Sequence, residues 1–384
     1  MKTVIHQMEL KLHLNQVLLY SRRLLGKETL VLSKKVAVAM SGGVDSSVAA
    51  LLLKQKGYQV FGITMDILPG DAIYDQENIT VKDARKVAAQ LGIPHYVTDL
   101  RQPFSDYVID GFCDEYFRGR TPNPCIVCNQ HIKFGFLMRT ALDLGADFLA
   151  TGHYVRIGKD NGEFLLYSGL DSSKDQSYFL YTLGQEQLAH TMFPLGDLHK
   201  EKVREIAIAS GLLVANKTES QEICFVSRGR YEDFVESCRP DVPKTGEFRF
   251  SDGKVLGMHH GVHRYTIGQR KGLGIAFGEP IFVTRIDPET ATVWLGRFDE
   301  LYSSSLLADE VRYISGQSFS EPIHLTAKIR SAAPKVEALV SSLGDTRMRV
   351  EFFEPQRAIT PGQSVVVYNG DQVLAGGTII EAGE

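Results

Sequence analysis

The hexapeptide Ser41-Gly42-Gly43-Val44-Asp45-Ser46 separates two runs of opposite character. Before it, Lys35-Val36-Ala37-Val38-Ala39-Met40 is a short, mostly apolar run bounded by the glycines, which predicts a buried strand. After it, residues 46–54 are rich in alanine and leucine, which predicts a helix. A strand, a glycine turn and a helix in this order aim several free backbone N–H groups at an anion.

Most residues of the hexapeptide suit a phosphate group. Gly42 and Gly43 allow the backbone to approach a phosphate closely, and the hydroxyls of Ser41 and Ser46 add donors. Asp45 would repel phosphate, so we expect it to hold Mg²⁺ or to cap the helix. An ordinary turn with a serine cap is the alternative. The lack of a lysine after the glycines excludes a Walker A loop, and no G-x-G-x-x-G is present. The hexapeptide resembles the S-G-G-x-D-S loop of ATP pyrophosphatases.

Composition sets wide limits on the class of protein. A chain of 384 residues, 43% hydrophobic and 23% charged, is long enough for two or three globular domains. Its net charge of −4 gives no argument for nucleic-acid binding from the total alone. Its five cysteines do not suggest a secreted disulfide scaffold, so we expect a reducing, cytoplasmic compartment. No apolar run approaches the ~20 residues that span a bilayer, which predicts no membrane partner.

Residues 35 to about 211 alternate between strand and helix patterns. We predict strands over 35–40, 59–65, 95–100 and 146–151, helices over 46–54, 79–91, 104–118 and 200–210, and a hairpin over 155–169. This pattern predicts an α/β fold, a parallel sheet covered on both faces by helices, with ligands at the carboxyl ends of the strands. The glycine loop, Met65 and Gly152-His153 all follow predicted strands.

We predict four segments along the chain: an N-terminal extension of unknown role (1–33), a catalytic domain (34–215), a small linking domain (216–279) and a β-barrel (280–384). The linking segment is rich in glycine, histidine and arginine. The barrel is predicted from evenly spaced short strands at 281–286, 292–295, 323–329, 347–353 and 364–368.

The cysteines suggest chemistry at one place in particular. Cys125 and Cys128 form a C-x-x-C after two prolines, which predicts a rigid loop with the thiols near the surface. Half a zinc site is one interpretation, but no second C-x-x-C occurs. We favour a redox or nucleophilic role, in which three nearby cationic side chains lower the thiol pKa: Arg120, His131 and Lys133. Cys113 and Cys238 are interpreted as structural, and Cys224 taken alone would be a core cysteine.

Taken in order, several motifs resemble those of the bacterial tRNA-specific 2-thiouridylases, within the pyrophosphate-loop ATPase superfamily. The motifs are the glycine loop, 119–124, Cys128-Asn129, 132–134, 151–154, 174–178, 220–225, 265–274, Arg330 and 361–363. The resemblance covers residue 34 to the C-terminus. It implies that ATP with Mg²⁺ binds at Ala39, Met40, Ser41, Gly42, Gly43, Val44, Asp45, Ser46, Met65 and Gly152.

The resemblance also implies the reaction. The C2 oxygen of a tRNA wobble uridine becomes adenylated, and Cys224 carries sulfur as a persulfide from a sulfur-relay protein or a cysteine desulfurase. Cys128 is the partner thiol, which either attacks the base or takes the place of the departing sulfur and leaves a Cys128–Cys224 disulfide that a reductant must open. The implied tRNA contacts are Asn123, Pro124, Cys125, His153, Lys174, Asp175, Gln176, Arg330, Ser331 and Gln363.

One position departs from the family pattern. The family often has aspartate, a candidate general acid or base, where this chain has Cys125. The interpretations left open are another adenylating enzyme of the same superfamily and a non-catalytic RNA-binding protein with zinc at Cys125 and Cys128.

Overall fold

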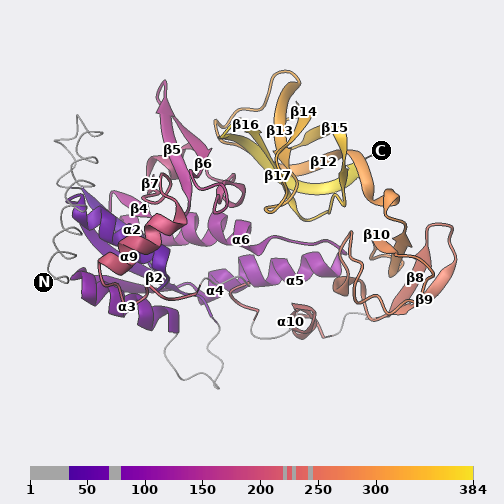
Figure 1. Ribbon diagram of the computed structural model, residues 1–384, viewed down its shortest axis with the longest axis horizontal. Helices are drawn as coiled ribbons and strands as arrows, with labels where there is room; N and C mark the ends of the chain where they lie inside the picture. Colours follow the sequence, from indigo (N-terminus) through magenta and orange to yellow (C-terminus); the bar gives the residue numbers. More distant parts are fainter. Residues whose placement is uncertain (1–33, 69–78, 219–222, 227–230, 241–244, 384) are drawn as a thin grey trace, which may run out of the picture.

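The computed structural model describes residues 34–68, 79–218, 223–226, 231–240 and 245–383, so the predicted extension 1–33 lies outside the described residues. An α/β part with the parallel sheet, a central sheet and a β-barrel follow one another along the chain (Figure 1). Long helices cross from the α/β part toward the other two (Figure 1). No helix within these residues has the length and apolarity to cross a membrane.

The parallel sheet has the strand order β3-β2-β1-β4-β7 and confirms the α/β prediction. Alternate residues of β1 enter two different cores: Val36 and Val38 pack with α2 on one face, and Ala37 packs on the other. Both faces are therefore buried, as a parallel sheet requires. The elements are β1 (Lys35–Ala39), α2 (Val44–Gln55), β2 (Gln59–Asp66), α3 (Ile79–Leu91), β3 (His95–Asp99), β4 (Phe148–Ala150), β7 (Thr191–Met192) and α9 (Lys200–Ala209).

The second face of the sheet is covered by two long, locally irregular helices. The first runs through α4 (Arg101–Phe104), a π-helical turn (Ser105–Ile109) and α5 (Asp110–Phe117). The second runs through α6 (Pro124–Val127), a π-helical stretch (Cys128–Leu137) and α7 (Met138–Asp143). The predicted helix over 104–118 is thus present, and the C-x-x-C begins a helix rather than lying in a loop. Proline suits this start because its missing N–H would be unpaired there anyway.

The central sheet has the order β10-β11-β8-β9 and corrects one prediction. The strands expected in the barrel at 281–286 and 292–295 are β10 (Phe282–Asp287) and β11 (Thr292–Gly296), and β11 pairs in parallel with β8 (Gly246–Phe250). The spacing of short apolar runs predicts that strands exist. It does not predict which strands pair, because partners more than 40 residues apart, such as β8 and β11, leave no local signal in the sequence. β9 (Val255–His259) and α10 (Tyr231–Cys238) complete this part.

The barrel closes through pairing of its first and last strands, β12 (Tyr302–Tyr313) and β17 (Gln372–Gly383). Between them lie β13 (Ile323–Lys328), β14 (Val336–Ser342), β15 (Met348–Arg357) and β16 (Ser364–Asn369). The predicted hairpin is β5 (Val155–Asp160) and β6 (Glu163–Ser168), followed by the short helix α8 (Gln185–Ala189). β6 pairs with β17, which attaches the hairpin to the barrel (Figure 1).

Candidate active site

The glycine loop connects β1 to α2 in a strained turn that only glycine fits. Gly42 has φ +63°, and a Cβ there would lie 2.7 Å from Cβ of Asp83. Gly43 is the N-cap of α2, and no side chain caps this helix. The Ser41 N–H donates to Oγ of Ser46 at 3.2 Å, which closes the loop on itself. The backbone N–H groups at the start of α2 are therefore left to bind an anion.

A cavity of about 200 Å³ opens at the carboxyl ends of the strands. It is lined by predicted ATP-site and tRNA-site residues together with residues not predicted: Ala39, Met40, Ser41, Asp45, Ser46, Met65, Gly152, His153 and Gln176 from the first group, and Ile63, Lys133, Leu137 and Thr151 from the second. The carboxyl-edge position follows the rule for open α/β sheets. These predicted residues are thus brought together, whereas Gly42, Gly43 and Val44 do not line the cavity, and the roles of all of them stay predictions.

Asp45 has partners that the sequence did not reveal. Both of its carboxylate oxygens accept hydrogen bonds from Nζ of Lys200 at 2.8 Å, and the Tyr154 hydroxyl donates to Oδ1 at 2.8 Å. Lys200 is only 7% exposed. The capping interpretation of Asp45 is wrong, because the side chain makes no cap hydrogen bond and instead forms a partly buried ion pair with Lys200. Lys200 starts α9, far along the chain, so only tertiary structure brings it here.

Gly152 allows the β4–β5 connection to lie against the glycine loop. A Cβ at this position would lie 2.8 Å from the Ser46 nitrogen and 2.9 Å from the Asp45 carbonyl carbon. The next residue, His153, hydrogen-bonds through Nδ1 to Oγ1 of Thr151 at 2.6 Å. Burial, with a smaller effect of the nearby Lys133 charge, holds the pKa of His153 well below its usual range. This imidazole is neutral at physiological pH.

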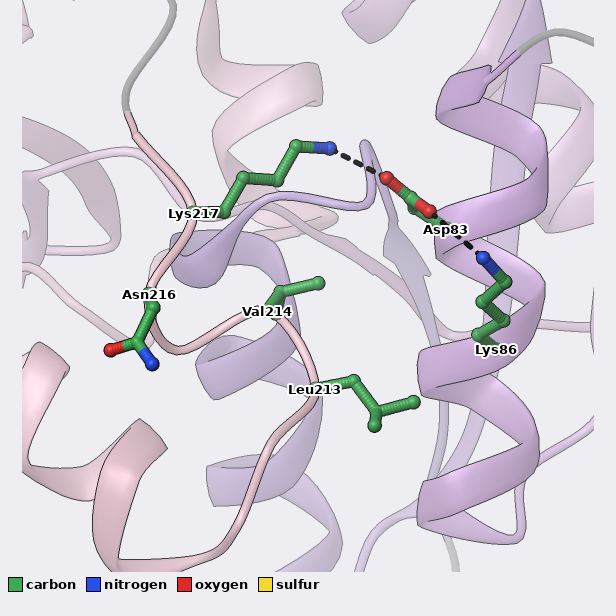
Figure 2. Close-up of a pocket in the computed structure, with 6 residues that line it drawn as sticks. All are labelled: Asp83, Lys86, Leu213, Val214, Asn216 and Lys217. Atoms are coloured by element: carbon green, nitrogen blue, oxygen red, sulfur yellow. Dashed lines mark hydrogen bonds and ion pairs between the residues drawn. The ribbon is translucent and has the colours of Figure 1, made fainter.

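A lysine also supports the glycine loop from the side of α3. Nζ of Lys217 donates to the Gly42 carbonyl oxygen at 3.1 Å and to Oδ2 of Asp83 at 2.8 Å. Figure 2 shows Lys217 reaching Asp83, which also pairs with Lys86, beside a second cavity of about 480 Å³. The hydrogen bond from Lys217 lowers the pKa of Asp83. The loop is therefore supported on both sides by lysines from distant segments.

The structure separates the two thiols of the C-x-x-C. Cys125 is exposed, whereas Cys128 is 8% exposed and belongs to the core, so the expectation of two surface thiols is wrong for Cys128. The helix that starts at Pro124 does not by itself separate the thiols, because positions i and i+3 of a helix lie on the same face; Cys128 is buried because it packs into the hydrophobic core. Cys224 is exposed, and all these thiols are free.

The charge of Lys133 affects the pKa of each of these thiols. The surrounding protein desolvates all three thiols, including Cys125 and Cys224, whose side chains still reach the surface. This desolvation raises the pKa of Cys125, of Cys128 and of Cys224, the last to about 11, and the charge of Lys133 opposes the rise in each. The neighbouring thiols also raise the pKa of Cys224, so Cys125, Cys128 and Cys224 are within electrostatic reach of one another. Nζ of Lys133 is held by Oδ1 of Asn129 at 2.9 Å.

Two of the cations expected to activate the thiols do not do so. Arg120 pairs with Glu115 at 3.3 Å, and the ring of His131 stacks on Tyr107 with centroids 4.7 Å apart. Burial lowers the pKa of His131, which leaves it neutral at physiological pH. The expectation that these side chains lower the thiol pKa is therefore wrong, because each has another partner or no charge. Sequence proximity could not distinguish them from Lys133.

Residues 119–124, which lead into α6, are held by both neighbouring parts of the chain. The Thr121 N–H donates to the Pro361 carbonyl at 2.9 Å, and Nε2 of Gln363 donates to the Thr121 carbonyl at 2.8 Å. Oγ1 of Thr121 donates to Oγ1 of Thr266 at 3.1 Å. Gln363, a predicted tRNA contact, thus contacts the segment that carries the C-x-x-C.

The other predicted tRNA contacts belong to three separate segments of the sequence. Asn123 is the N-cap of α6, and Pro124 is buried. Asp175 accepts backbone hydrogen bonds from Gly169 at 3.0 Å and Ser177 at 3.1 Å, and the neighbouring Lys174 is half-buried. Nη2 of Arg330 donates to the carbonyls of Ala358 and Arg357, and Ser331 beside it is exposed. Arg330 therefore stabilises its own part of the barrel.

No group of three or more metal-ligating side chains occurs among the residues with described positions. Asp45 is the carboxylate that lines the nucleotide cavity, and it already carries a lysine partner. For these residues, a cation at the cavity would need Asp45 together with ligands from a bound nucleotide.

The fold and the loop place this chain among the nucleotide-binding α/β enzymes whose glycine loop lacks a lysine, the pyrophosphate-loop ATPases. Family models match three successive ranges: a tRNA methyl transferase HUP domain at 34–228, a tRNA methyl transferase PRC-barrel domain at 232–297 and an aminomethyltransferase beta-barrel domain at 303–379.

Curated relatives cover nearly the whole chain. The chain is 48% identical to tRNA-specific 2-thiouridylase MnmA of Clostridioides difficile, over 91% of this chain and 98% of the relative. It is 49% identical to MnmA 1 of Caldanaerobacter subterraneus subsp. tengcongensis, over 90% and 98% respectively. The chain belongs to the tRNA-specific 2-thiouridylase family. A solved U34-tRNA thiolase, NcsA from Methanococcus maripaludis, is 21% identical over 58% of this chain and 70% of its own, with a TM-score of 0.34, too low to support an inference.

Proposed function

We propose that this protein is a tRNA-uridine 2-sulfurtransferase that adenylates C2 of the wobble uridine with ATP and replaces the oxygen with sulfur from a cysteine persulfide. The observation that carries the proposal is the position of Lys133. This side chain lines the nucleotide cavity, and its charge partly offsets the rise that burial causes in the pKa of Cys125, Cys128 and Cys224. One ammonium group is thus within electrostatic reach of a nucleotide and of the sulfur chemistry.

The first half of the reaction takes place at the glycine loop. The free N–H groups at the start of α2 bind the phosphates, and Met65 and Gly152 contact the adenosine part. Asp45 and the hydroxyl of Ser46 are the residues that would hold Mg²⁺, which neutralises phosphate charge when bound. Lys200 orients Asp45 and supplies the positive charge that a Walker lysine gives in other loops. Attack of the uridine O2 on the α-phosphate releases pyrophosphate and leaves AMP as a good leaving group.

The second half moves sulfur. Cys224 is exposed, which suits loading as a persulfide by a donor protein, either a sulfur-relay protein or a cysteine desulfurase. The terminal sulfur attacks C2, and AMP leaves with the original oxygen. The Cys128 thiolate then attacks Sγ of Cys224, so the persulfide S–S bond breaks, the sulfur stays on the base, and a Cys128–Cys224 disulfide forms. A reductant supplies two electrons to open it. Free thiols of this kind suit a cytoplasmic setting.

The tRNA would lie across the parts of the chain that meet at residues 119–124. Asn123, Pro124 and Cys125 form the wall next to the flipped base, with His153 and Gln176 at the cavity. Lys174, Asp175, Arg330, Ser331 and Gln363 would contact the rest of the tRNA. For Gln363 and Arg330, their hydrogen bonds to Thr121 and to barrel carbonyls favour a positioning contribution as well.

The test is a defined reaction of the full chain with ATP, unmodified tRNA and a persulfide source. Nucleoside mass analysis should detect 2-thiouridine, and AMP with pyrophosphate should be the tRNA-dependent products. ADP as the main product would contradict adenylation. AMP without 2-thiouridine would indicate a different adenylating enzyme, and stoichiometric zinc without turnover would indicate the RNA-binding alternative.

A further inference from the structure

Two aromatic rings and two arginines gather where the central sheet meets the barrel. Phe298 lies in the connection from β11 to β12, and Tyr302 is the first residue of β12 (Figure 1). The two rings are 46% and 45% exposed, and their centroids lie 5.7 Å apart in an edge-to-face contact. Arg357 ends β15, and Arg330 follows β13. Exposed rings beside arginines are typical of surfaces that bind unpaired bases.

The fold holds this group in a fixed arrangement. Tyr302 and Arg357 are directly paired residues of the antiparallel strands β12 and β15, so their side chains project from the same face. The guanidinium of Arg357 lies 5.3 Å from the centre of the Phe298 ring. Phe298 also contacts the buried ring of Phe282, with centroids 5.6 Å apart. Because these contacts already order the side chains, a ligand that binds them loses little affinity to side-chain ordering.

The two arginines bring like charges together. Nη2 of Arg330 donates to the carbonyl oxygen of Arg357 at 3.3 Å, and burial together with the charge of Arg357 lowers the pKa of Arg330. Within the described part of the chain, neither guanidinium forms an ion pair with a carboxylate. The carboxylate of Glu300, in the turn after Phe298, instead accepts the Arg297 N–H at 2.7 Å. An anion beside the two guanidiniums would remove their repulsion, and arginine matches the geometry of phosphate.

Contacts between side chains and backbone connect this group to the segment that carries the C-x-x-C. Ala358, next to Arg357, packs against Gly268, where an added Cβ would lie 2.8 Å from Cβ of Ala358. Two positions before Gly268, Thr266 accepts the hydrogen bond from Thr121 at 3.1 Å. A tRNA strand that contacts Arg357 would therefore lie next to the predicted base-binding segment.

We propose that Phe298, Tyr302, Arg330 and Arg357 form a binding site for one unpaired nucleotide of the substrate tRNA, outside the nucleotide cavity. The inference rests on the proposed function, since it takes tRNA as the ligand. The two guanidiniums bind the phosphate, and the base stacks on the exposed rings. Stacking accepts any base, because every base has a flat face. The site therefore holds and orients the tRNA and does not select the uridine.

The experiment measures binding of an unmodified tRNA transcript to the full chain at several salt concentrations, without ATP or a sulfur source. Tyr302→Ala should weaken binding about tenfold at each salt concentration, because stacking is lost and no counterion contact changes. Phe298→Leu, which keeps the packing on Phe282, should weaken binding in the same way. Tyr302→Trp should bind like the wild type. Arg357→Gln should weaken binding and also reduce the slope of log Kd against log salt concentration by about one.

The matched controls lie on β15, away from the proposed site. Phe353 is 61% exposed and makes an edge-to-face contact with His324, with centroids 4.9 Å apart, so Phe353→Ala removes a comparable exposed ring. Arg349 is exposed on the same strand as Arg357, so Arg349→Gln removes the same charge. Both controls should keep the Kd and the salt dependence of the wild type.

Two outcomes overturn the proposal. One is tRNA binding of wild-type strength in both Tyr302→Ala and Arg357→Gln, which would leave this surface to a protein partner. The other is an equal loss in the variants and their controls. Binding is measured apart from catalysis, so the two proposals fail separately. Loss of binding in the variants without 2-thiouridine formation by the wild type would contradict only the proposed function, and 2-thiouridine formation with unchanged binding would contradict only this site.

Discussion

The nucleotide cavity and the cysteine segment are built in different ways. The cavity is stabilised from within the α/β part, since Asp45 pairs with Lys200 and Tyr154, and Lys217 supports Gly42. The segment leading to the C-x-x-C is held from outside, by Thr266 of the central part and by Pro361 and Gln363 of the barrel. ATP chemistry can therefore be assembled by one part, whereas sulfur chemistry depends on all three.

The largest expected effect separates the three thiols near Lys133. Cys128→Ser and Cys224→Ser should each abolish 2-thiouridine formation, because serine cannot bear or exchange sulfur. Cys125→Ser should keep measurable activity, and Cys125→Asp should be tolerated best, because it restores the family's usual carboxylate. Nucleoside mass analysis of the four variants is the measurement. Total loss in both Cys125 variants, with bound zinc in the wild type, would contradict the persulfide assignment.

Lys200→Met tests the cavity alone. It removes the cation that contacts both oxygens of the partly buried Asp45 carboxylate, so the carboxylate loses its fixed position and AMP formation should fall about a hundredfold. Binding of tRNA should stay near wild type. The matched control is Lys202→Met on the same helix, which removes only an exposed pair with Glu205. If both variants lose AMP formation equally, the effect belongs to α9 and not to Asp45.

Gly362→Ala tests the cysteine segment from the barrel side. Gly362 has φ +90°, and a Cβ would lie 2.8 Å from the Thr121 nitrogen, so the variant must displace residues 120–121. We expect sulfur transfer to fall about tenfold while ATP binding without tRNA is unchanged. Gly344→Ala is the control, since Gly344 has φ +81° with no atom within 4 Å of the added Cβ. Equal losses of sulfur transfer in the two variants would mean that backbone strain at the substituted glycine, and not displacement of residues 120–121, causes the loss.

The smallest effect concerns Lys133, which belongs to both regions. Because the pKa of Cys224 is about 11, its alkylation should accelerate about tenfold per pH unit between pH 7 and 10. Lys133→Met removes the charge that lowers this pKa, so less thiolate is present and alkylation at pH 8 should slow about threefold. Lys133→Arg should retain most of the rate. Unchanged alkylation in Lys133→Met would remove Lys133 from the thiol site.

Much of the α/β part could be predicted because its signals are local. The apolar run before Ser41, the alanine- and leucine-rich run after it and the helical spacing of the apolar residues in 79–91 each lie within about a dozen residues. The structure confirms the strand and the two helices that they predict. The parallel sheet then explains why Met65 and Gly152 reach the same cavity. The resemblance contributed what local patterns could not, namely the prediction that Cys128 and Cys224 act together in sulfur transfer.

What the sequence concealed are partners that meet only after folding. Lys200 lies 155 positions from Asp45, and nothing in its own surroundings marks it as the partner of that carboxylate. The same holds for Lys217 and Gly42, and for β11, which pairs with β8 rather than joining the barrel. Arg120 and His131 show the converse, since closeness in sequence to Cys125 did not bring their charges to it.

The pairing of β17 with β6 has a consequence for the order in which the molecule folds. Gln372 and Val373 pair with Tyr167 and Leu166, residues about 200 positions earlier, and the same strand also pairs with β12 and β16. Contacts at such separation close slowly, because the entropy of a long loop is lost before any contact stabilises it. The parallel sheet can thus form early. Closure of the barrel and its attachment to the hairpin both require β17, so we expect them to occur together in one late kinetic step.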